Sequence, residues 1–395
     1  AVRMAKASAS IATLKLPFDS RKPVTSERSD TPSVKMHPRD VALSEKVDLV
    51  NRVVESARAS MKNSVNITGM YGELYGPKYI ASSDHTRITW DLLVTDLRVR
   101  ATAKTDRGEL VMGTEGIGGS YGLEQFKEES STPESLGRLA AEHANEQLEA
   151  KSCPAGKFRG LVENRLAGVL AHESFGHLSE ADFVVTGGSP LTGKTGAQLG
   201  TEHVTIVDGG RVDVKKHGGL WLPYDDQGIT TGKTIVMDKG VLRHYLHSRG
   251  TAKRLGQEPT GNARAVDFTF SPIVRMTNTY FAAGDLSEEE ALELLDTGVY
   301  AIQSFGGQVS GDGSFLFSAA RGYWVENGEK KYPIREVALS GNILDLLGRV
   351  MGATRDLRIT SGYFGGCGKG AQVPLPVGLG GPMMVIDGIV FGGKA

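Results

Sequence analysis

Two histidines and a glutamate lie close together in the segment GVLAHESFGHLSEAD, residues 168–182. His172 and Glu173 are adjacent, as in the helices of zinc proteases, where two metal-binding histidines four residues apart flank a glutamate that acts as general base. Here His177 follows His172 by five residues. On a regular α-helix this spacing turns the second imidazole roughly 140° from the first, so the two rings could not bind one ion. Either the match is a coincidence or the helix is deformed.

A deformed helix is consistent with the surrounding sequence. The run NRLAGVLAHESFGH is apolar on most sides, which is typical of a buried helix. Buried polar groups without partners cost ~1–3 kcal/mol each, so the three polar side chains need hydrogen bonds or a metal. A π-bulge inserts one extra residue, and ~4.4 residues in that turn would return both histidines to one face. A shared metal therefore predicts a widened or broken helix between Ser174 and Gly176, whereas two separate core histidines are the alternative.

A catalytic zinc takes three protein ligands and keeps an open position for water, so a third ligand is needed. Later candidates are His203, His217, His244, His247, the pair Asp225 and Asp226, and Cys367. His244 and His247 lie three apart in a strand-like run, which sends them to opposite faces. His203 opens a strand and His217 lies in a polar stretch, so both read as ordinary histidines. Cys367 differs because the glycines of YFGGCGKG let the backbone approach a buried site closely, although a core cysteine in a Gly-rich turn fits equally.

The elements that position these residues fall into two expected domains, because 395 residues exceed the usual size of one. In residues 1–150, a Pro- and Ser-rich linker over 16–40 precedes a helix capped by Ser44. Strands over 78–115 with a turn at 106–108 follow, and then a helix from Thr132 to Ala150. We expect this N-terminal domain to be α+β.

Residues 151–395 are expected to form a larger, mostly antiparallel, β-rich domain that carries the metal-site helix, which makes the whole chain α+β. Its apolar runs are broken by Asp-Gly, Lys-Gly and Asn-Gly, as in hairpins: HVTIVDGGRVDV, TIVMDKGVLRHYLH, GSFLFSAARGYWVENGEKKYPI and MMVIDGIVFGG. A helix capped by Ser287 and ended by Gly298 interrupts the strands, and NILDLLGRVMG is expected to carry a shorter helix.

The composition narrows the function classes. The net charge is −1, with 45 basic and 46 acidic residues, so no field favours nucleic acid or an anionic membrane. Neither a signal peptide nor an apolar run of about 18 residues is evident. The two cysteines, Cys153 and Cys367, form no disulfide framework, which favours a reducing, cytoplasmic location. The chain begins at Ala1 in what reads as the end of an Ala-rich helix, as in a fragment or a processed form.

Several segments carry a resemblance to a known family. In order along the chain they are GVLAHESFGHLSEAD, YDDQG, PTGNARA, RMTNTY, FGGQV, FSAARGYWVENGE and CGKGAQVPLPVGLGGP. The chain resembles the TldD/PmbA family of metalloproteases over nearly all of residues 150–395 and more loosely over 42–150. The resemblance implies a zinc ion (Zn2+) held by His172, His177 and Cys367, with Glu173 as catalytic base. Because all four are present, the chain resembles the TldD-type subunit, which bears the metal.

The same resemblance implies a partner and a class of substrate. Such a subunit pairs with a homologous TldE/PmbA-type subunit, and the dimer encloses a cavity that admits peptides or unfolded proteins. The family also has a segment before the position of Ala1, and often a glutamate where Asp225-Asp226 is followed by Gln227. A β-turn is the alternative reading of that acidic motif.

Other readings of the chemistry and of the substrate site stay open. A thiol hydrolase using Cys367 and a non-catalytic modulator that binds a partner are two further function classes. The Gly-rich run 362–381 offers a strand edge to an extended peptide, or simply forms turns.

Overall fold

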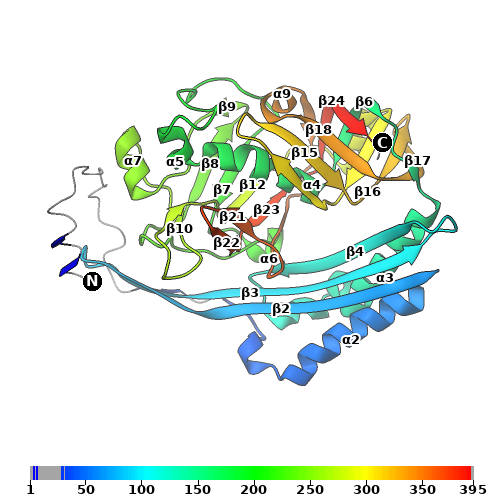
Figure 1. Ribbon diagram of the computed structural model, residues 1–395, viewed down its shortest axis with the longest axis horizontal. Coiled ribbons are helices and arrows are strands. Elements are labelled where there is room, and N and C mark those ends of the chain that lie inside the picture. The colour runs from blue at the N-terminus through cyan, green and yellow to red at the C-terminus, as the bar shows by residue number, and fades with distance from the viewer. Residues whose placement is uncertain (1–2, 5, 8–27, 31, 393–395) are drawn as a thin grey trace.

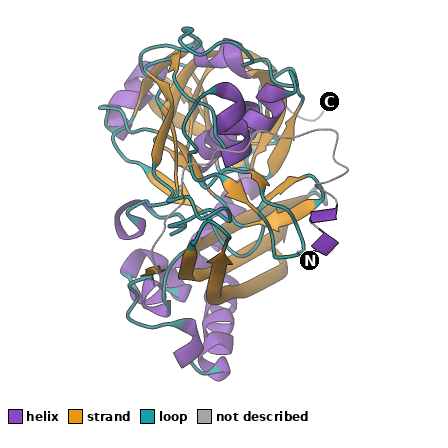
Figure 2. Ribbon diagram, turned by 90° about the vertical axis from the view of Figure 1, so that its left-hand side faces the viewer, coloured by secondary structure: helices purple, strands orange, loops and turns teal. Residues whose placement is uncertain are grey.

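The computed structural model describes residues 3–4, 6–7, 28–30 and 32–392. Most of the linker expected over 16–40, and most of the Ala-rich start, lie outside these residues. The described part of the linker contains β1 (Arg28–Asp30), which pairs in parallel with β3 (Arg87–Lys104), and the 3₁₀ turn η1 (Pro38–Asp40). Two bodies of structure follow, the smaller below the larger in Figure 1 and again in the turned view of Figure 2. The fold is α+β with mostly antiparallel sheets, as predicted.

Long antiparallel strands and two helices form the first body. The strands are β2 (Ser64–Ala81), β3 (Arg87–Lys104) and β4 (Leu110–Gly119), and the helices are α2 (Leu43–Ser60) and α3 (Pro133–Glu149), with the 3₁₀ turns η2 (Leu123–Lys127) and η3 (Glu129–Ser131) before α3. Both helices pack on one face of the strands, around buried Val53, Leu97 and Ala140. The opposite face packs against the second body through Trp90 and Leu222, among others.

Local signals placed some helix ends and missed others. Thr132 caps α3 as predicted, because its Oγ1 accepts a hydrogen bond from the Ser135 N–H at 3.2 Å. The expected cap at Ser44 is wrong, since α2 begins at Leu43 and its N-cap is Ala42, which offers no side-chain bond. The strands begin earlier than expected, at Ser64, because tertiary pairing with β3 extends β2 through a stretch rich in glycine and exposed residues.

Two larger sheets build the second body. The ten-stranded sheet runs in the order β14 (Gly306–Val309), β15 (Ser314–Ala319), β18 (Val337–Asn342), β24 (Met384–Gly392), β6 (Gly156–Val162), β13 (Gly298–Ile302), β16 (Arg321–Glu326), β17 (Glu329–Arg335) and β5 (Lys151–Ser152), with β19 (Val350–Ala353) also on β24. The six-stranded sheet runs β20 (Arg358–Thr360), β23 (Gly378–Gly381), β12 (Asn278–Phe281), β7 (Ile206–Gly209), β8 (Lys233–Asp238) and β9 (Val241–Leu242).

Smaller elements complete this body. Two short hairpins pair β10 (Ala263–Arg264) with β11 (Ile273–Val274) and β21 (Cys367–Lys369) with β22 (Gln372–Leu375). The helices are α4 (Asn164–Val169), the π-helix η4 (Leu170–Gly176), the 3₁₀ turn η5 (His177–Ser179), α5 (Ala181–Val185), α6 (Val214–His217), α7 (Arg249–Leu255), α8 (Glu288–Leu295) and α9 (Ile343–Leu347).

The predicted hairpins form where the turn joins neighbouring strands. β8 and β9 pair across the Lys-Gly turn at 239–240, and β16 and β17 pair across the Asn-Gly turn at 327–328. The Asp-Gly at 208–209 is not a hairpin turn, because β7 pairs with β8 and β12 instead. The Asp-Gly at 387–388 is a bulge inside the continuous strand β24.

The helices of the second body are shorter than the sequence suggested. Ser287 caps α8 as predicted, with a capping box to Glu290, but the helix ends at Leu295 and Gly298 opens β13 instead of ending the helix. The run NILDLLGRVMG carries the short helix α9 as predicted, and its last residues join β19. Sheet pairing therefore takes residues that local signals assign to helices.

The helical run α4–η4–η5 lies in the core of the second body. It packs against β12, β20 and β23 of the six-stranded sheet and contacts β13 and β14 of the ten-stranded sheet. Leu166, Leu170 and Phe175 are buried between them. At Gly168 the helix backbone approaches β23 so closely that an added Cβ would collide with the backbone of Gly380. Burial on both sides explains why this segment is apolar all round.

Candidate metal centre

The helix that carries His172 and His177 is widened by one residue. Residues Leu170–Gly176 form the π-helix η4, and the His177 N–H donates to the carbonyl oxygen of His172, five residues back. The two imidazole rings consequently lie side by side, with centroids 5.2 Å apart and planes 81° to each other. The predicted widening between Ser174 and Gly176 is therefore confirmed, and the five-residue spacing places both rings on one side of the helix.

Cys367 comes to the same point from the opposite end of the chain. Its Sγ lies 3.3 Å from Nε2 of His177. One ligand atom from each of His172, His177 and Cys367 lies within 4.8 Å of the others. In the part of the chain that the structure describes, no other three side chains of His, Cys, Asp or Glu bring their ligand atoms together in this way. His172 and Cys367 are buried, and His177 is 23% exposed.

The segment that leads to Cys367 is held from two sides. Arg275, which is fully buried, donates to the carbonyl oxygen of Cys367 at 2.6 Å and to that of Gln372 at 3.2 Å. From the first body, the buried carboxylate of Asp96 accepts a hydrogen bond from the Phe364 N–H at 3.1 Å. Both bodies of the fold thus fix the backbone that places the thiol beside the histidines.

Glu173 stands at the rim of the cluster. Its Oε2 is 3.9 Å from Nε2 of His177, and its side chain is 40% exposed. Burial of part of the side chain raises the pKa of Glu173 above its usual value, while the neighbouring His177 opposes that rise and Glu180 adds to it. A carboxylate with a raised pKa is better matched to proton exchange near neutral pH.

The two histidines have opposite electrostatic surroundings. Burial, the neighbouring His177 and the charges of Arg275 and Arg264 lower the pKa of His172 well below its usual value, so the ring is neutral and keeps a lone pair. Burial also lowers the pKa of His177, but hydrogen bonds to Cys367 and Glu180 raise it to about 10. Without an ion, these hydrogen bonds therefore favour the protonated form of His177.

The residues fit a zinc ion. Two imidazoles and a thiolate are ligands that zinc prefers, and three protein ligands with an open position are typical of catalytic zinc. Zinc bonds of about 2.0 to 2.3 Å in a tetrahedron set ligand atoms roughly 3.5 Å apart, which the contact between Cys367 and His177 already approaches. Nδ1 of His172 is buried and has no hydrogen-bond partner among the described residues. Because orphaned buried nitrogens are costly, an additional partner for this ring is expected.

The other sequence candidates lie away from this cluster. His203 and His244 are exposed, His217 contacts the Leu357 carbonyl oxygen at 3.3 Å, and buried His247 contacts Gln257 Oε1 at 2.9 Å. His244 and His247 do not point to opposite faces of a strand as predicted, because β9 ends at Leu242 and both histidines follow it in a loop.

The acidic motif has a structural place. Asp225 accepts hydrogen bonds from the backbone N–H groups of Gln227, Ile229 and Ala263 at 2.8 to 3.0 Å, and its carbonyl oxygen closes a turn with Gly228. Asp226 forms an ion pair of 2.6 Å with Lys78 of β2. The β-turn reading is confirmed, and the motif joins the two bodies of the fold.

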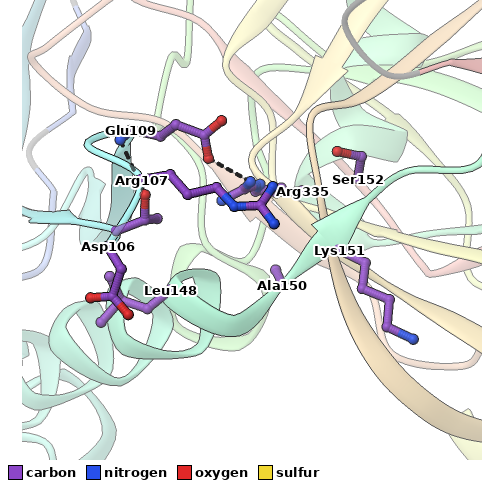
Figure 3. A pocket seen from close by; sticks show the side chains of 9 residues that line it. Asp106, Arg107, Glu109, Leu148, Ala150, Lys151, Ser152 and Arg335 are labelled. Carbon is purple, nitrogen blue, oxygen red and sulfur yellow. Dashed lines mark hydrogen bonds and ion pairs between the residues drawn. The ribbon is translucent and has the colours of Figure 1, made fainter.

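A cavity of about 380 Å³ lies elsewhere, where the turn between β3 and β4 meets the end of α3 and strand β17 (Figure 3). Glu109 and Arg335 form an ion pair of 2.6 Å across it. Its lining residues are Thr105, Asp106, Arg107, Glu109, Leu148, Ala150, Lys151, Ser152 and Arg335. None of them is a histidine or a cysteine, so this cavity does not contain the chemistry of the cluster.

Comparison with known proteins agrees with the geometry. The family model described as "PmbA/TldA metallopeptidase C-terminal domain" matches residues 155–393, and the one described as "PmbA/TldA metallopeptidase central domain" matches residues 37–148. The chain belongs to the PmbA/TldD metallopeptidase family. A relative named "Metalloprotease MJ0996", from Methanocaldococcus jannaschii, is 38% identical over 349 residues, which cover 88% of this chain and 74% of that protein. The chain is accordingly a metalloprotease.

One further relative and one solved structure extend the comparison. A Saccharolobus solfataricus protein named "Zinc metalloprotease TldD homolog" is 33% identical over 247 residues, 62% of this chain and 54% of that one. The crystal structure of TldE from Thermococcus kodakarensis shares the fold with a TM-score of 0.77 at 15% identity, covering 100% of this chain and 84% of that one. No helix among the described residues of this PmbA/TldD family member is long and apolar enough to cross a membrane.

Sequence reasoning missed the polar residues around the cluster. Glu180 and Asp182 belong to the quoted segment 168–182, Lys369 belongs to CGKG, and Arg275 opens RMTNTY, yet none received a role. Glu180 contacts His177 at 2.9 Å, and Lys369 contacts Glu180 at 3.1 Å. The available signal was their presence in apolar or Gly-rich surroundings, which buried charges enter only with partners.

Proposed function

We propose that this chain is a zinc-dependent peptidase that hydrolyses peptides or unfolded protein segments. In this proposal His172, His177 and Cys367 bind the metal, and Glu173 is the general base. The observation that supports it most strongly is the π-helix, which brings histidines five residues apart to within ligand distance of a cysteine 190 residues further on. The relative named as a zinc metalloprotease supports the choice of metal.

The chain's own residues supply the rest of the chemistry. A zinc ion supplies a Lewis acid that polarises a peptide carbonyl and makes water more acidic. Glu173, adjacent to His172 and near His177, takes a proton from the attacking water and returns it to the leaving amine. Its partial exposure gives that carboxylate access to substrate. His172, held neutral by burial, and the Cys367 thiolate offer the electron pairs that a cation requires.

Substrate binding is proposed to involve strand edges near the cluster. The β21–β22 hairpin is a separate two-stranded sheet that starts at Cys367, so its edges lie close to the proposed ligands. The later glycines, in β23, do not offer an edge, because β23 pairs with β12 and β20 on its two sides. Pairing through backbone hydrogen bonds would select extended chains with little side-chain preference.

The proposal also includes a partner and a cellular location. We propose a dimer with a TldE/PmbA-type subunit, since a TldE protein shares this fold. Cys367 acts as a ligand only when reduced, and both cysteines are free thiols in this structure, so we propose a cytoplasmic location.

Metal analysis combined with a peptidase assay tests the function. The zinc-loaded protein, alone and co-expressed with a TldE/PmbA-type subunit, should cleave an unstructured peptide, and a metal chelator should abolish cleavage. Glu173→Gln should retain zinc and lose about 10²- to 10⁴-fold in rate. A Glu173→Gln protein with full zinc and full activity would refute the role of Glu173. Cleavage of a folded protein as fast as its unfolded form would count against selection of extended chains.

A cysteine-dependent hydrolase is a second candidate, favoured by the 3.3 Å contact between Cys367 Sγ and His177 Nε2. Inhibition experiments distinguish the thiol mechanism from the metal mechanism. A thiol alkylator that inactivates rigorously metal-free protein supports the thiol mechanism, whereas loss of activity on chelation and recovery with zinc supports the metal. Stoichiometric zinc without hydrolysis in the presence of a partner would instead favour a non-catalytic modulator.

A further inference from the structure

A buried carboxylate lies directly behind the proposed metal ligand His177. Glu180 follows the 3₁₀ turn η5, and its side chain is 0% exposed. Its Oε2 accepts a hydrogen bond from Nδ1 of His177 at 2.9 Å and another from Nζ of Lys369 at 3.1 Å. Its Oε1 has no partner among the described residues. A fully buried carboxylate is costly unless it is paired, and the contacts with His177 and Lys369 provide that pairing.

Backbone contacts fix the position of Glu180. The Ala181 N–H donates to the carbonyl oxygen of Leu246 at 2.9 Å, and the Leu246 N–H donates to the carbonyl oxygen of Ser179 at 2.9 Å. These bonds attach the residues on both sides of Glu180 to the strand-like segment at Leu246. The carboxylate therefore approaches His177 from a rigid part of the fold.

Lys369 lies on β21, two residues after Cys367, and its side chain is 10% exposed. Besides Glu180, its ammonium contacts both carboxylate oxygens of Asp182, at 2.7 and 2.8 Å, and the Val274 carbonyl oxygen at 3.0 Å. It also lies over the ring of Phe183, 4.3 Å from the centroid. All three N–H donors of the ammonium thus have acceptors, and the side chain has one defined position.

The two contacts of Glu180 join the two halves of the cluster. The pairing of β21 with β22 is irregular between Cys367 and Lys369, and both side chains face the histidine helix, as their contacts with His177 and Glu180 show. Lys369 binds Glu180 while Cys367 meets His177. Because Nδ1–H donates to Glu180, Nε2 of His177 is the nitrogen directed at Cys367, and it offers a lone pair to an ion once it gives up its proton.

We propose that Glu180 and Lys369 are positioning residues of the metal centre: Glu180 fixes the tautomer and orientation of His177, and Lys369 fixes Glu180 and ties it to the cysteine strand. The inference rests on the proposed function, because it assumes that His172, His177 and Cys367 bind zinc. Carboxylates that bind the distal nitrogen of a metal-ligating histidine raise its basicity, and their loss typically costs 10- to 100-fold in metal affinity.

Asp182 provides a matched control. It contacts the same ammonium as Glu180 and would lose the same charge on conversion to the amide. Among the described residues, however, its carboxylate contacts Lys369 and the Phe183 N–H and not His177. Its side chain is 33% exposed. A difference between Glu180→Gln and Asp182→Asn therefore reports the contact with His177 and not the loss of a negative charge nearby.

Zinc affinity of the full chain, measured by competition with a chromogenic chelator, tests the inference. Glu180→Gln should weaken zinc binding about 10- to 100-fold. Asp182→Asn should stay within about fivefold, because a partly exposed ion pair contributes little. Lys369→Met leaves the His177–Glu180 contact in place and should weaken zinc less than Glu180→Gln but more than Asp182→Asn. If Glu180→Gln fails to fold, the zinc affinity of Lys369→Met still tests the inference.

Cobalt substitution supplies a second readout, independent of peptidase activity. The absorption bands of bound Co²⁺ should shift in Glu180→Gln and remain unchanged in Asp182→Asn, because only the first alters a ligand's orientation. Zinc affinity and cobalt bands equal to those of the unaltered protein in both Glu180→Gln and Lys369→Met would overturn this inference alone. Absence of zinc binding in the unaltered protein would overturn both this inference and the proposed function.

Discussion

Gly176, the last residue of the π-helix, is a place where one methyl group should disturb the proposed metal centre. An added Cβ at this position would lie far inside the contact distance of Met276 Sδ and 3.2 Å from the Ala171 carbonyl oxygen. Met276 is 0% exposed, so its side chain has no path to solvent. The Gly176→Ala substitution must therefore move either Met276 or the helical turn between the two histidines.

Two effects oppose each other in this substitution. Overpacking a filled core costs about 1–3 kcal/mol, and the flexible thioether of methionine places the cost near the middle, ~2 kcal/mol. Alanine in place of a helical glycine stabilises the folded protein by about 0.5–1 kcal/mol. The net loss in the free energy of unfolding is therefore ~1 kcal/mol. For a domain the size of the second body, this corresponds to a melting temperature about 2–4 °C lower.

A second substitution separates the two effects. Met276→Ala alone opens a cavity and should cost about 2–5 kcal/mol. Once the thioether is gone, Gly176→Ala meets no collision with it, and its helix preference stabilises the protein. The effect of Gly176→Ala on the melting temperature should accordingly change sign between the two backgrounds. Gly232→Ala is the control, because an added Cβ there meets nothing within 4 Å.

The assay is thermal unfolding together with zinc competition. If the strain moves the helical turn instead of Met276, zinc affinity falls as well, by up to the factor of roughly 5 to 150 that corresponds to ~1–3 kcal/mol. The same shift of the melting temperature, in sign and size, in both backgrounds would refute the reasoning, because it would mean that Gly176 and Met276 do not compete for space.

Three further predictions concern the thiol, the metal and pH. Cys367→Ser should weaken zinc binding by more than about 100-fold, because losing even a residue that only supports a ligand costs 10- to 100-fold in metal affinity. Cys153→Ser is the control and should leave zinc binding unchanged. Unchanged zinc stoichiometry in Cys367→Ser would remove that residue from the site. Free zinc at 100 times its Kd should add about 2.7 kcal/mol to the free energy of unfolding. A chelator should therefore lower the melting temperature, and added zinc should restore it. An unaffected melting temperature would contradict a metal site in the folded protein. Burial lowers the pKa of His247 from 6.5 to about 4, so the unfolded chain takes up a proton at a higher pH than the folded protein does. The fold therefore has its full stability above pH 6.5 and loses roughly 3 kcal/mol as the pH falls from 6.5 through about 4. His247→Gln should make the melting temperature depend less on pH between 6.5 and about 4. Parallel curves of melting temperature against pH for the two proteins would contradict this role of His247.

Local signals in the sequence were sufficient for several elements. The Thr132-Pro133 start of α3, the Ser287 cap of α8 and the Asn-Gly turn between β16 and β17 depend on interactions within a few residues. The prediction failed where pairing is nonlocal. The Asp-Gly at 208–209 resembles a hairpin turn, but β7 finds its partners in β8 and β12, and no local signal reveals such partners.

By itself the sequence determined the chemistry of the candidate site and the geometric condition on it. His172, Glu173 and His177 with an extra residue require a widened helix if the histidines share an ion, and the sequence could not choose between that and two separate core histidines. The tertiary structure decided the geometry: η4 is a π-helix, and Cys367 lies 3.3 Å from His177.

Only the fold could identify the residues behind the proposed ligands. Glu180 and Lys369 are 189 positions apart and meet because β21 packs beside the turn that follows the histidine helix. Spacing along the chain encodes which side chains share a helix face, since that geometry is periodic. It does not encode which strand arrives from elsewhere, because that depends on the free energy of the whole packed core.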